Sequence, residues 1–215
     1  MTIIHMPGQT LSEIRSLLAA AGLAPQHRFG QNFLIDLNLM RKLVAAADLQ
    51  PGDVVLEVGA GTGSLTEMLL DARVRVIAVE IDRGFQGLLR ERLGEQARFT
   101  LVQGDALASK HRVNPLVLSV LRENPPEASG AYKLVANLPY QIATPLLIDL
   151  LLMSEPVGPA ENAADRTLAR RDRAVTVAPV RFDRLTCTIQ KEVAERLTGE
   201  HRPDRHLPSA GANRR

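Results

Sequence analysis

The chain has 215 residues, with 26 basic and 24 acidic side chains and a net charge of +2. This length suits one domain of ordinary size with a small appendage, and the near balance of charge excludes polyanion binding through overall charge alone. The longest apolar stretch, residues 145–153, contains Asp149 and is too short to span a bilayer, and the N-terminus has no basic segment leading into an apolar one. We therefore expect a soluble, cytoplasmic protein without a membrane segment.

Two helices are predicted in the first 50 residues. Thr10 and Glu13 fit a capping box that opens an amphipathic helix through about Ala21, and Asp36 can cap a second helix. A loop joins them. We treat residues 1–50 as an N-terminal helical segment.

From residue 53 onward, short apolar runs alternate with helical stretches. This alternation predicts an α/β fold with a mostly parallel central sheet flanked by helices. The single cysteine, Cys187, has no CxxC partner for a metal site and is expected to be buried in the last strand. The predicted strands are residues 53–58, 74–81, 98–103, 133–137 and 184–189.

Composition sets the outer limits of this predicted core. The stretch 155–181 is rich in Pro, Ala and charge, and the end of the chain has no apolar periodicity. We predict a core over 51–198 that contains a flexible insertion at 155–181, followed by a disordered tail at 199–215.

A glycine-rich turn follows the first strand. Gly59, Gly61 and Gly63 permit a tight turn, and the helix after them presents unpaired backbone amides to a ligand. The spacing is GxGxG and not the GxGxxG that cradles a pyrophosphate, which disfavours a dinucleotide. The alternative is a turn that only joins a strand to a helix.

Acidic residues end the next two strands. Glu80 and Asp82 lie about 20 residues past the glycines, where a carboxylate can accept both hydroxyls of a ribose. Asp105 ends the third strand at the same edge and can accept from an adenine amine. A solvated strand end or a helix cap explains any one of these acids equally well, but acids on consecutive strands favour a nucleoside-containing ligand.

The fourth strand ends in Asn137, Leu138, Pro139 and Tyr140. Pro139 makes the turn rigid and holds Leu138 extended, so the Asn137 amide oxygen and the Leu138 carbonyl point in fixed directions. Two such acceptors can grip one NH2 group and favour the pyramidal form that an adenine amine approaches during attack. Tyr140 can stack on a base. The alternative is a strand-terminating turn with a half-buried tyrosine.

Six motifs occur along the chain in the order GQNFL (30–34), LEVGAGTG (56–63), VEID (79–82), GDAL (104–107), NLPYQIATPL (137–146) and QKEVAERL (190–197). In this order they resemble the ribosomal RNA adenine dimethyltransferases, and within them look closest to the bacterial small-subunit type. The erythromycin-resistance methyltransferases of the large subunit share the order but differ in the first and fifth motifs, so we rank them second.

The resemblance implies a Rossmann-like fold that binds S-adenosylmethionine, with a loop of the 1–50 segment covering the cofactor. It also implies N6,N6-dimethylation of two adjacent adenosines near the 3′ end of small-subunit ribosomal RNA, on that RNA or on the pre-ribosomal small subunit, by a monomer. Asn137, Leu138, Pro139 and Tyr140 would position the target adenosine. The implied cofactor-binding residues are Gln31, Asn32, Leu34, Glu57, Gly59, Gly61, Glu80, Ile81, Asp105, Ala106 and Asn137.

The chain departs from the family pattern at several points. Gln141 and Ala143 replace the usual Asn and Ser, the stretch 155–181 is longer than the usual connection, and the sequence ends without the family's small helical domain. These departures motivate a second hypothesis, a non-catalytic RNA-binding or ribosome-assembly factor that retains the cofactor pocket. A DNA adenine methyltransferase is a third, and a dinucleotide-dependent oxidoreductase the least favoured.

Basic residues near the expected site could contact phosphates, although a solvated charged face is the commoner explanation for each. They are Arg28, Arg41, Lys42 and the run 168–173.

Overall fold

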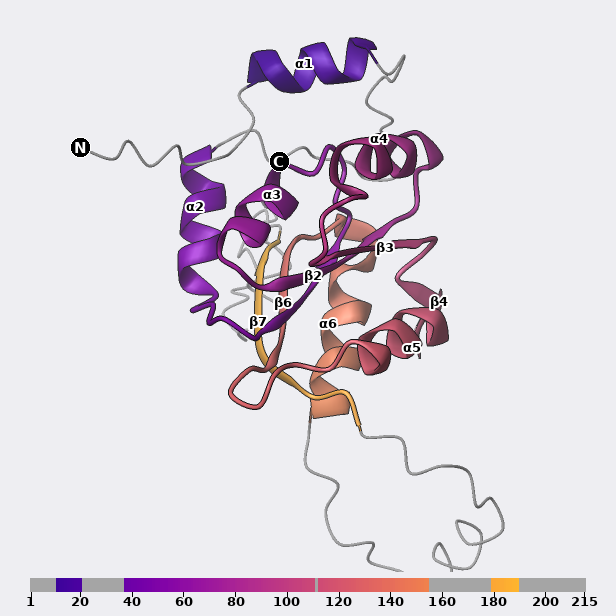
Figure 1. Cartoon of the computed structure of the whole chain (residues 1–215). Coiled ribbons are helices and arrows are strands. Elements are labelled where there is room, and N and C mark those ends of the chain that lie inside the picture. Colours follow the sequence, from indigo (N-terminus) through magenta and orange to yellow (C-terminus); the bar gives the residue numbers. More distant parts are fainter. Residues whose placement is uncertain (1–10, 21–36, 111, 155–178, 190–215) are drawn as a thin grey trace, which may run out of the picture.

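Five parallel strands form the centre of the protein in a computed structural model (Figure 1), which describes residues 11–20, 37–110, 112–154 and 179–189. The strand order is β3-β2-β1-β6-β7. This confirms the predicted parallel α/β fold. The five strands are β1 (Val54–Val58), β2 (Arg75–Glu80), β3 (Phe99–Gln103), β6 (Tyr132–Asn137) and β7 (Phe182–Thr188).

Helices cover both faces of this sheet (Figure 1). Alternate residues of each strand point to opposite faces, so every inner strand contributes to two cores. Side chains of α2, α3 and α4 pack on one face and those of α5 and α6 on the other. The helices are α1 (Leu11–Ala20), α2 (Leu37–Ala46), α3 (Ser64–Asp71), α4 (Arg83–Leu93), α5 (Pro115–Glu123) and α6 (Tyr140–Ser154).

The two predicted N-terminal helices are confirmed as α1 and α2, but their capping residues Thr10 and Asp36 lie outside the described residues. A short antiparallel pair, β4 (Leu107–Ser109) and β5 (Arg112–Val113), was not predicted, because strands of two or three residues have no measurable periodicity. Most of 155–181 and all of 199–215 lie outside the described ranges, so the division at 1–50, 51–198 and 199–215 stays a prediction.

A β-bulge sets the register between β6 and β7. Tyr132 lies opposite Phe182, but Lys133 lies opposite Arg184, so Asp183 has no opposite residue. From there the pairing is regular to Asn137 opposite Thr188. The extra residue therefore decides which face each later side chain of β7 occupies.

The amino-terminal edge of the sheet is fastened by a buried ion pair. The Lys133 ammonium lies 2.8 Å from Asp53 Oδ2, and both side chains are almost inaccessible. Asp53 also accepts from the backbone amides of Gln50 at 2.8 Å and Ala131 at 2.9 Å. Burial alone would raise the pKa of Asp53, but the hydrogen bonds from Lys133 and the two amides hold it below its usual value.

No helix within the described ranges is both long and apolar enough to cross a membrane.

Candidate cofactor and substrate site

The glycine loop begins where β1 ends. Gly59, Gly61 and Gly63 all have positive φ angles of +79°, +55° and +83°, a backbone conformation that residues with a Cβ rarely adopt. At Gly59 an added Cβ would lie 3.2 Å from the ring of Pro139. The loop thus needs glycine twice over at this point, for its conformation and for its contact with the turn after β6.

Glu80 ties this loop to the end of β2. Its Oε2 atom accepts from the Gly61 amide at 2.8 Å, and its Oε1 atom accepts from the Asp82 amide at 2.9 Å. The side chain is buried, with 3% of its surface exposed, and burial raises its pKa despite those two bonds. Each carboxylate oxygen has a second lone pair, which leaves acceptor capacity for two ribose hydroxyls.

Glu57 lies beneath the same loop, on the sheet face that α3 covers. Its Oε2 atom accepts from the Thr66 hydroxyl at 2.7 Å, and the residue is 1% exposed. Burial raises the pKa of Glu57 to about 8, and the nearby Glu80 charge acts in the same direction, while the Thr66 bond opposes both. The carboxyl of Glu57 is enclosed by protein. Its predicted role in orienting a cofactor amine stays a prediction.

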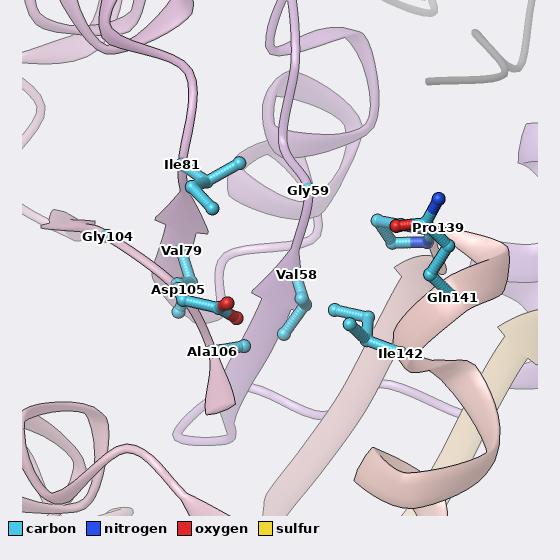
Figure 2. A pocket seen from close by; sticks show the side chains of 10 residues that line it. All are labelled: Val58, Gly59, Val79, Ile81, Gly104, Asp105, Ala106, Pro139, Gln141 and Ile142. Atoms are coloured by element: carbon cyan, nitrogen blue, oxygen red, sulfur yellow. The ribbon is translucent and has the colours of Figure 1, made fainter. Parts of the chain in front are cut away.

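A cavity of about 100 Å³ opens beside the loop at the carboxyl ends of β1 and β2. Figure 2 shows Val58, Asp105 and Ile142 pointing into it from three different elements. Of the predicted residues, Gly59, Ile81, Asp105, Ala106 and Pro139 line it; the others that line it are Val58, Val79, Gly104, Gln141 and Ile142.

Most lining residues that were not predicted are direct neighbours, in the sequence, of residues that were predicted. Val58 and Val79 are strand residues next to the glycine loop and to Glu80, so the parallel alignment of strand ends brings them to the same edge. Ile142 and Gln141 lie in the first turn of α6, directly after the Asn137–Tyr140 turn.

Asp105 is held by its own turn. Its Oδ1 atom accepts from the Leu107 amide at 3.0 Å, and its backbone carbonyl accepts from the Asn114 side chain at 2.9 Å. The carboxylate is exposed and points into the cavity (Figure 2). An amine at the cavity rim can therefore donate to Asp105 Oδ2.

The turn after β6 reaches the same place. Asn137 is the last residue of β6 and Tyr140 the first of α6, and the Pro139 carbonyl accepts from the Ile142 and Ala143 amides at 3.1 Å. Leu138 buries its side chain in the core, so only its backbone is available to a ligand. The Asn137 Oδ1 atom accepts from the hydroxyl of Thr188 on β7.

Several predicted residues do not line this cavity. Asn137 and Tyr140 are half-buried beside it, and Glu57, Gly61 and Glu80 lie around the loop. Gln31, Asn32 and Leu34 lie outside the described residues, as do Arg28 and the run 168–173. In the ranges that can be described, no group of three or more His, Cys, Asp or Glu side chains is arranged to hold a metal ion.

Comparison with known proteins places this arrangement in a family. The sequence model of the family described as ribosomal RNA adenine dimethylase matches residues 23–206 of this chain. The chain belongs to this family. It is 40% identical to the ribosomal RNA small subunit methyltransferase A of Phenylobacterium zucineum over 88% of this chain and 54% of that protein. It is 43% identical to the protein of the same name from Moorella thermoacetica over 70% of this chain and 50% of that one.

The chain thus spans about half the length of the curated relatives it matches. Among solved structures it is similar to a dimethyladenosine transferase from Plasmodium falciparum, with 24% identity over 76% of this chain and 45% of that one and a TM-score of 0.49. The 23S rRNA methyltransferase ErmE gives 25% identity, 79% and 52% coverage and a TM-score of 0.49. Both TM-scores fall below 0.5, so the family assignment rests on the family model and the curated relatives.

The cavity fits part of S-adenosylmethionine, the cofactor that the family implies. Its apolar walls and the Asp105 carboxylate at its rim match an adenine ring, which has two apolar faces and a donor amine. About 100 Å³ is well below the roughly 300–1,000 Å³ of a pocket for a drug-sized ligand. The cavity therefore encloses a ring only, and the ribose and methionine parts would extend over the glycine loop.

Proposed function

We propose that the chain transfers methyl groups from S-adenosylmethionine to N6 of two adjacent adenosines near the 3′ end of small-subunit ribosomal RNA. It would act as a cytoplasmic monomer during ribosome biogenesis, on the RNA or the pre-ribosomal small subunit. One observation carries this proposal: Gly59 of the cofactor loop lies against Pro139 of the turn that holds the amine acceptors. Family membership and the names of the curated relatives support the choice of substrate.

The cofactor would be oriented from three strand ends. Asp105 Oδ2 would accept from the adenine amine, Ile81 would pack on the ring, and Glu80 would accept from the ribose hydroxyls. Gly59 and Gly61 let the backbone approach closely. Residues 31, 32 and 34 would complete the methionine end of this site.

When bound, S-adenosylmethionine supplies an electrophilic methyl group on a positively charged sulfur. Asn137 Oδ1 and the Leu138 carbonyl would accept the two N–H groups of the target amine and direct its lone pair at that methyl. The methyl group would pass from sulfur to the amine nitrogen, and the electron pair of the broken C–S bond would stay on sulfur. The methylated amine then releases a proton to water, so no strong general base is needed.

Tyr140 would hold the target base. The side chain is half-buried at the start of α6, one residue after the cavity-lining Pro139, where a ring can stack on a base presented by the RNA. Arg41 and exposed Lys42 on α2 are candidates for phosphate contacts.

The test is methyl transfer by the purified chain. Labelled S-adenosylmethionine and immature small ribosomal subunits are incubated with it, the RNA is digested, and dimethyladenosine is measured by mass. The Asn137→Ala variant should lose about 100- to 1,000-fold in turnover, with a much smaller loss of cofactor affinity. A matched control is Asn124→Ala, because the Asn124 amide binds Arg75 and Val120 at the other end of the sheet.

Normal turnover by Asn137→Ala would reject this mechanism. A second candidate, a non-catalytic RNA-binding or assembly factor, is favoured by one observation: Gln141, which stands where the family pattern usually has Asn, lines the cavity. Cofactor binding without any methyl transfer would support that candidate.

A further inference from the structure

A second cavity, of about 450 Å³, lies between α5 and α6. Figure 1 shows these two helices side by side on one face of the sheet, and β5 closes the cavity at one end. Its volume falls within the roughly 300–1,000 Å³ of sites that hold small organic ligands. The cavity is separate from the one beside the glycine loop, because the two share no lining residue.

Part of the wall of this second cavity is apolar. Leu118, Leu152 and Met153 contribute to it, and Leu152 is 67% exposed. α6 is apolar on nearly all sides, a composition typical of a helix that is covered all round. Beside the cavity the described residues leave it uncovered, so the wall offers an apolar surface on which a flat ring can pack.

Asp149 is the one charged residue of α6, and it lines the same cavity. Its Oδ2 atom is buried without a hydrogen-bond partner, which holds for no other side-chain atom of the described residues. A buried acceptor without a donor is costly, and an aspartate is rarely enclosed unless it is paired. The terminal torsion of a carboxyl group is broad, so a small rotation presents this oxygen to a donor in the cavity.

Two arginines complete the lining. Arg112 belongs to β5 and Arg122 to the last turn of α5, and both are exposed. Neither makes an ion pair with Asp149 or with any other acid in the part of the chain that the structure describes. Guanidinium groups form paired hydrogen bonds to phosphate oxygens, so two of them at one cavity suit a phosphate group.

We infer that this cavity binds a purine nucleotide of the RNA other than the adenosines to be methylated. The phosphate would lie on Arg112 and Arg122, the base on the apolar wall, and the base amine would donate to Asp149. A site for phosphate alone would not contain a carboxylate, and a site for an apolar ligand would contain none of the three charged groups. The inference rests on the proposed function for the choice of RNA.

The position of the cavity suits the same RNA strand as the active site. Asp149 lies nine residues after Tyr140 on α6, which at a rise of ~1.5 Å per residue is roughly 14 Å along the helix. A few unpaired nucleotides can span that distance, and single-stranded RNA is commonly recognised through bases turned out of the stack. One strand can therefore place a base on Tyr140 and another in this cavity.

The first test uses the sign of a charge change. Asp149→Asn removes a negative charge, so a cavity that only attracts phosphates would bind RNA more tightly in this variant. A cavity that uses the carboxylate to accept an amine should instead bind RNA about three- to tenfold less tightly. Fluorescence anisotropy with the full chain and unmethylated small-subunit ribosomal RNA, at one fixed low salt concentration, measures this affinity.

The arginines are tested with a control of equal charge. Arg112→Ala combined with Arg122→Ala should weaken RNA binding on the order of tenfold or more. Arg83→Ala combined with Arg90→Ala removes the same charge from exposed positions on α4, over the other face of the sheet, and should weaken it by less than about threefold.

Three results of these affinity measurements would overturn the inference. They are equal losses in the two double variants, unchanged or tighter RNA binding by Asp149→Asn, and losses seen with immature subunits but not with the bare RNA. The last of these would assign the cavity to a ribosomal protein.

A second measurement observes the cavity directly through Met153. Its methyl signal, assigned by its loss in Met153→Leu, is followed while adenosine 5′-monophosphate is added to the full chain saturated with S-adenosylhomocysteine, which keeps the nucleotide out of the cofactor site. We expect a saturable shift that is lost in Asp149→Asn. Purine riboside 5′-monophosphate, which lacks the amine, should bind more weakly, and inorganic phosphate should leave the signal unchanged.

An equal shift from inorganic phosphate would show an anion site and overturn the inference. A shift with the nucleotide but unchanged RNA affinity in every variant would assign the cavity to a free nucleotide and would also overturn it. Neither measurement uses methyl transfer. A chain that binds the cofactor but transfers no methyl group would fail the proposed function, while the RNA affinities and the Met153 signal would still decide this inference.

Discussion

Two carboxylates with little exposed surface lie at opposite ends of the same sheet, Glu80 more deeply enclosed than Asp53, and they differ in their partners. Asp53, at the amino-terminal edge, has a lysine ammonium and two backbone amides, and its pKa falls below the usual value. Glu80, at the carboxyl edge, has backbone amides as its hydrogen-bond donors, and its pKa rises. Among the described residues no cation pairs with Glu80, and a buried carboxylate in that setting gains from each further donor, so Glu80 stays the proposed acceptor for ribose hydroxyls, while Asp53 stabilises the fold.

The largest expected effect comes from breaking the Asp53–Lys133 ion pair at the amino-terminal edge of the sheet. Lys133→Ala leaves the Asp53 charge buried without its cation and should lower the free energy of unfolding by about 3–5 kcal/mol. Urea unfolding at pH 7 measures this, with Lys110→Ala in the exposed turn after β4 as the control. A loss below about 1 kcal/mol would mean that the pair is not the main fastening of this edge. The cofactor affinity of the folded fraction should stay unchanged.

The next effect concerns the pH dependence of stability. The pKa of Glu57 is about 8 in the folded chain against an ordinary 4.5, so the folded state holds a proton that the unfolded chain releases between these values. The contribution of Glu57 is therefore complete below about pH 4.5 and is lost as the pH rises through 8. Glu57→Gln cannot titrate, so its stability relative to wild type should rise by about 2–4 kcal/mol between pH 5 and pH 8.

Thermal or urea unfolding across that pH range measures the difference. Glu95→Gln, at an exposed position after α4, is the matched control and should follow the wild-type profile. Parallel profiles for wild type and Glu57→Gln would show that the Glu57 carboxyl is charged in the folded chain.

The smallest expected effect comes from changing Glu80 at the carboxyl edge of the sheet. Glu80→Gln keeps the size of the side chain but replaces one acceptor oxygen by an NH2 group, so S-adenosylmethionine affinity should fall about 10- to 100-fold, the value of about one hydrogen bond to a charged group. Calorimetric titration measures the affinity, and Asp71→Asn, an exposed acid at the end of α3, is the control. Unchanged affinity would remove Glu80 from the ribose site.

The sequence indicated the strands and their polar ends well, for a physical reason. The inner strands of a parallel sheet are buried on both faces and appear as continuous apolar runs, and Glu80, Asp105 and Asn137 mark the points where such runs stop. Because all those ends meet at one edge, the sequence also predicted a common site, and the cavity beside Gly59 and Asp105 lies there.

The sequence alone could not predict which distant residues pair with each other. Lys133 stands out as a lysine inside an apolar strand, but its partner Asp53 lies 80 residues earlier, and one sequence does not encode which strand becomes the neighbour. The same holds for Thr188, which has no local signal and reaches Asn137 only through the register of β7. The roles of individual site residues stay predictions for the same reason.

The bulge at Asp183 separates two parts of the chain that respond differently to insertions. An insertion before the bulge leaves the residue opposite Asn137 unchanged, whereas an insertion between the bulge and Thr188 would shift it. If Asp183 instead paired with Lys133, the register that starts at Tyr132 and Phe182 would run on without the bulge, and Asn137 would face Cys187, a thiol, in place of the Thr188 hydroxyl. Loss of the bulge with Asp183 retained would thus change the site five residues away, whereas deletion of Asp183 would leave Thr188 opposite Asn137. The chain that joins α6 to β7 enters before the bulge, so its length can change between homologues without altering which side chain faces Asn137.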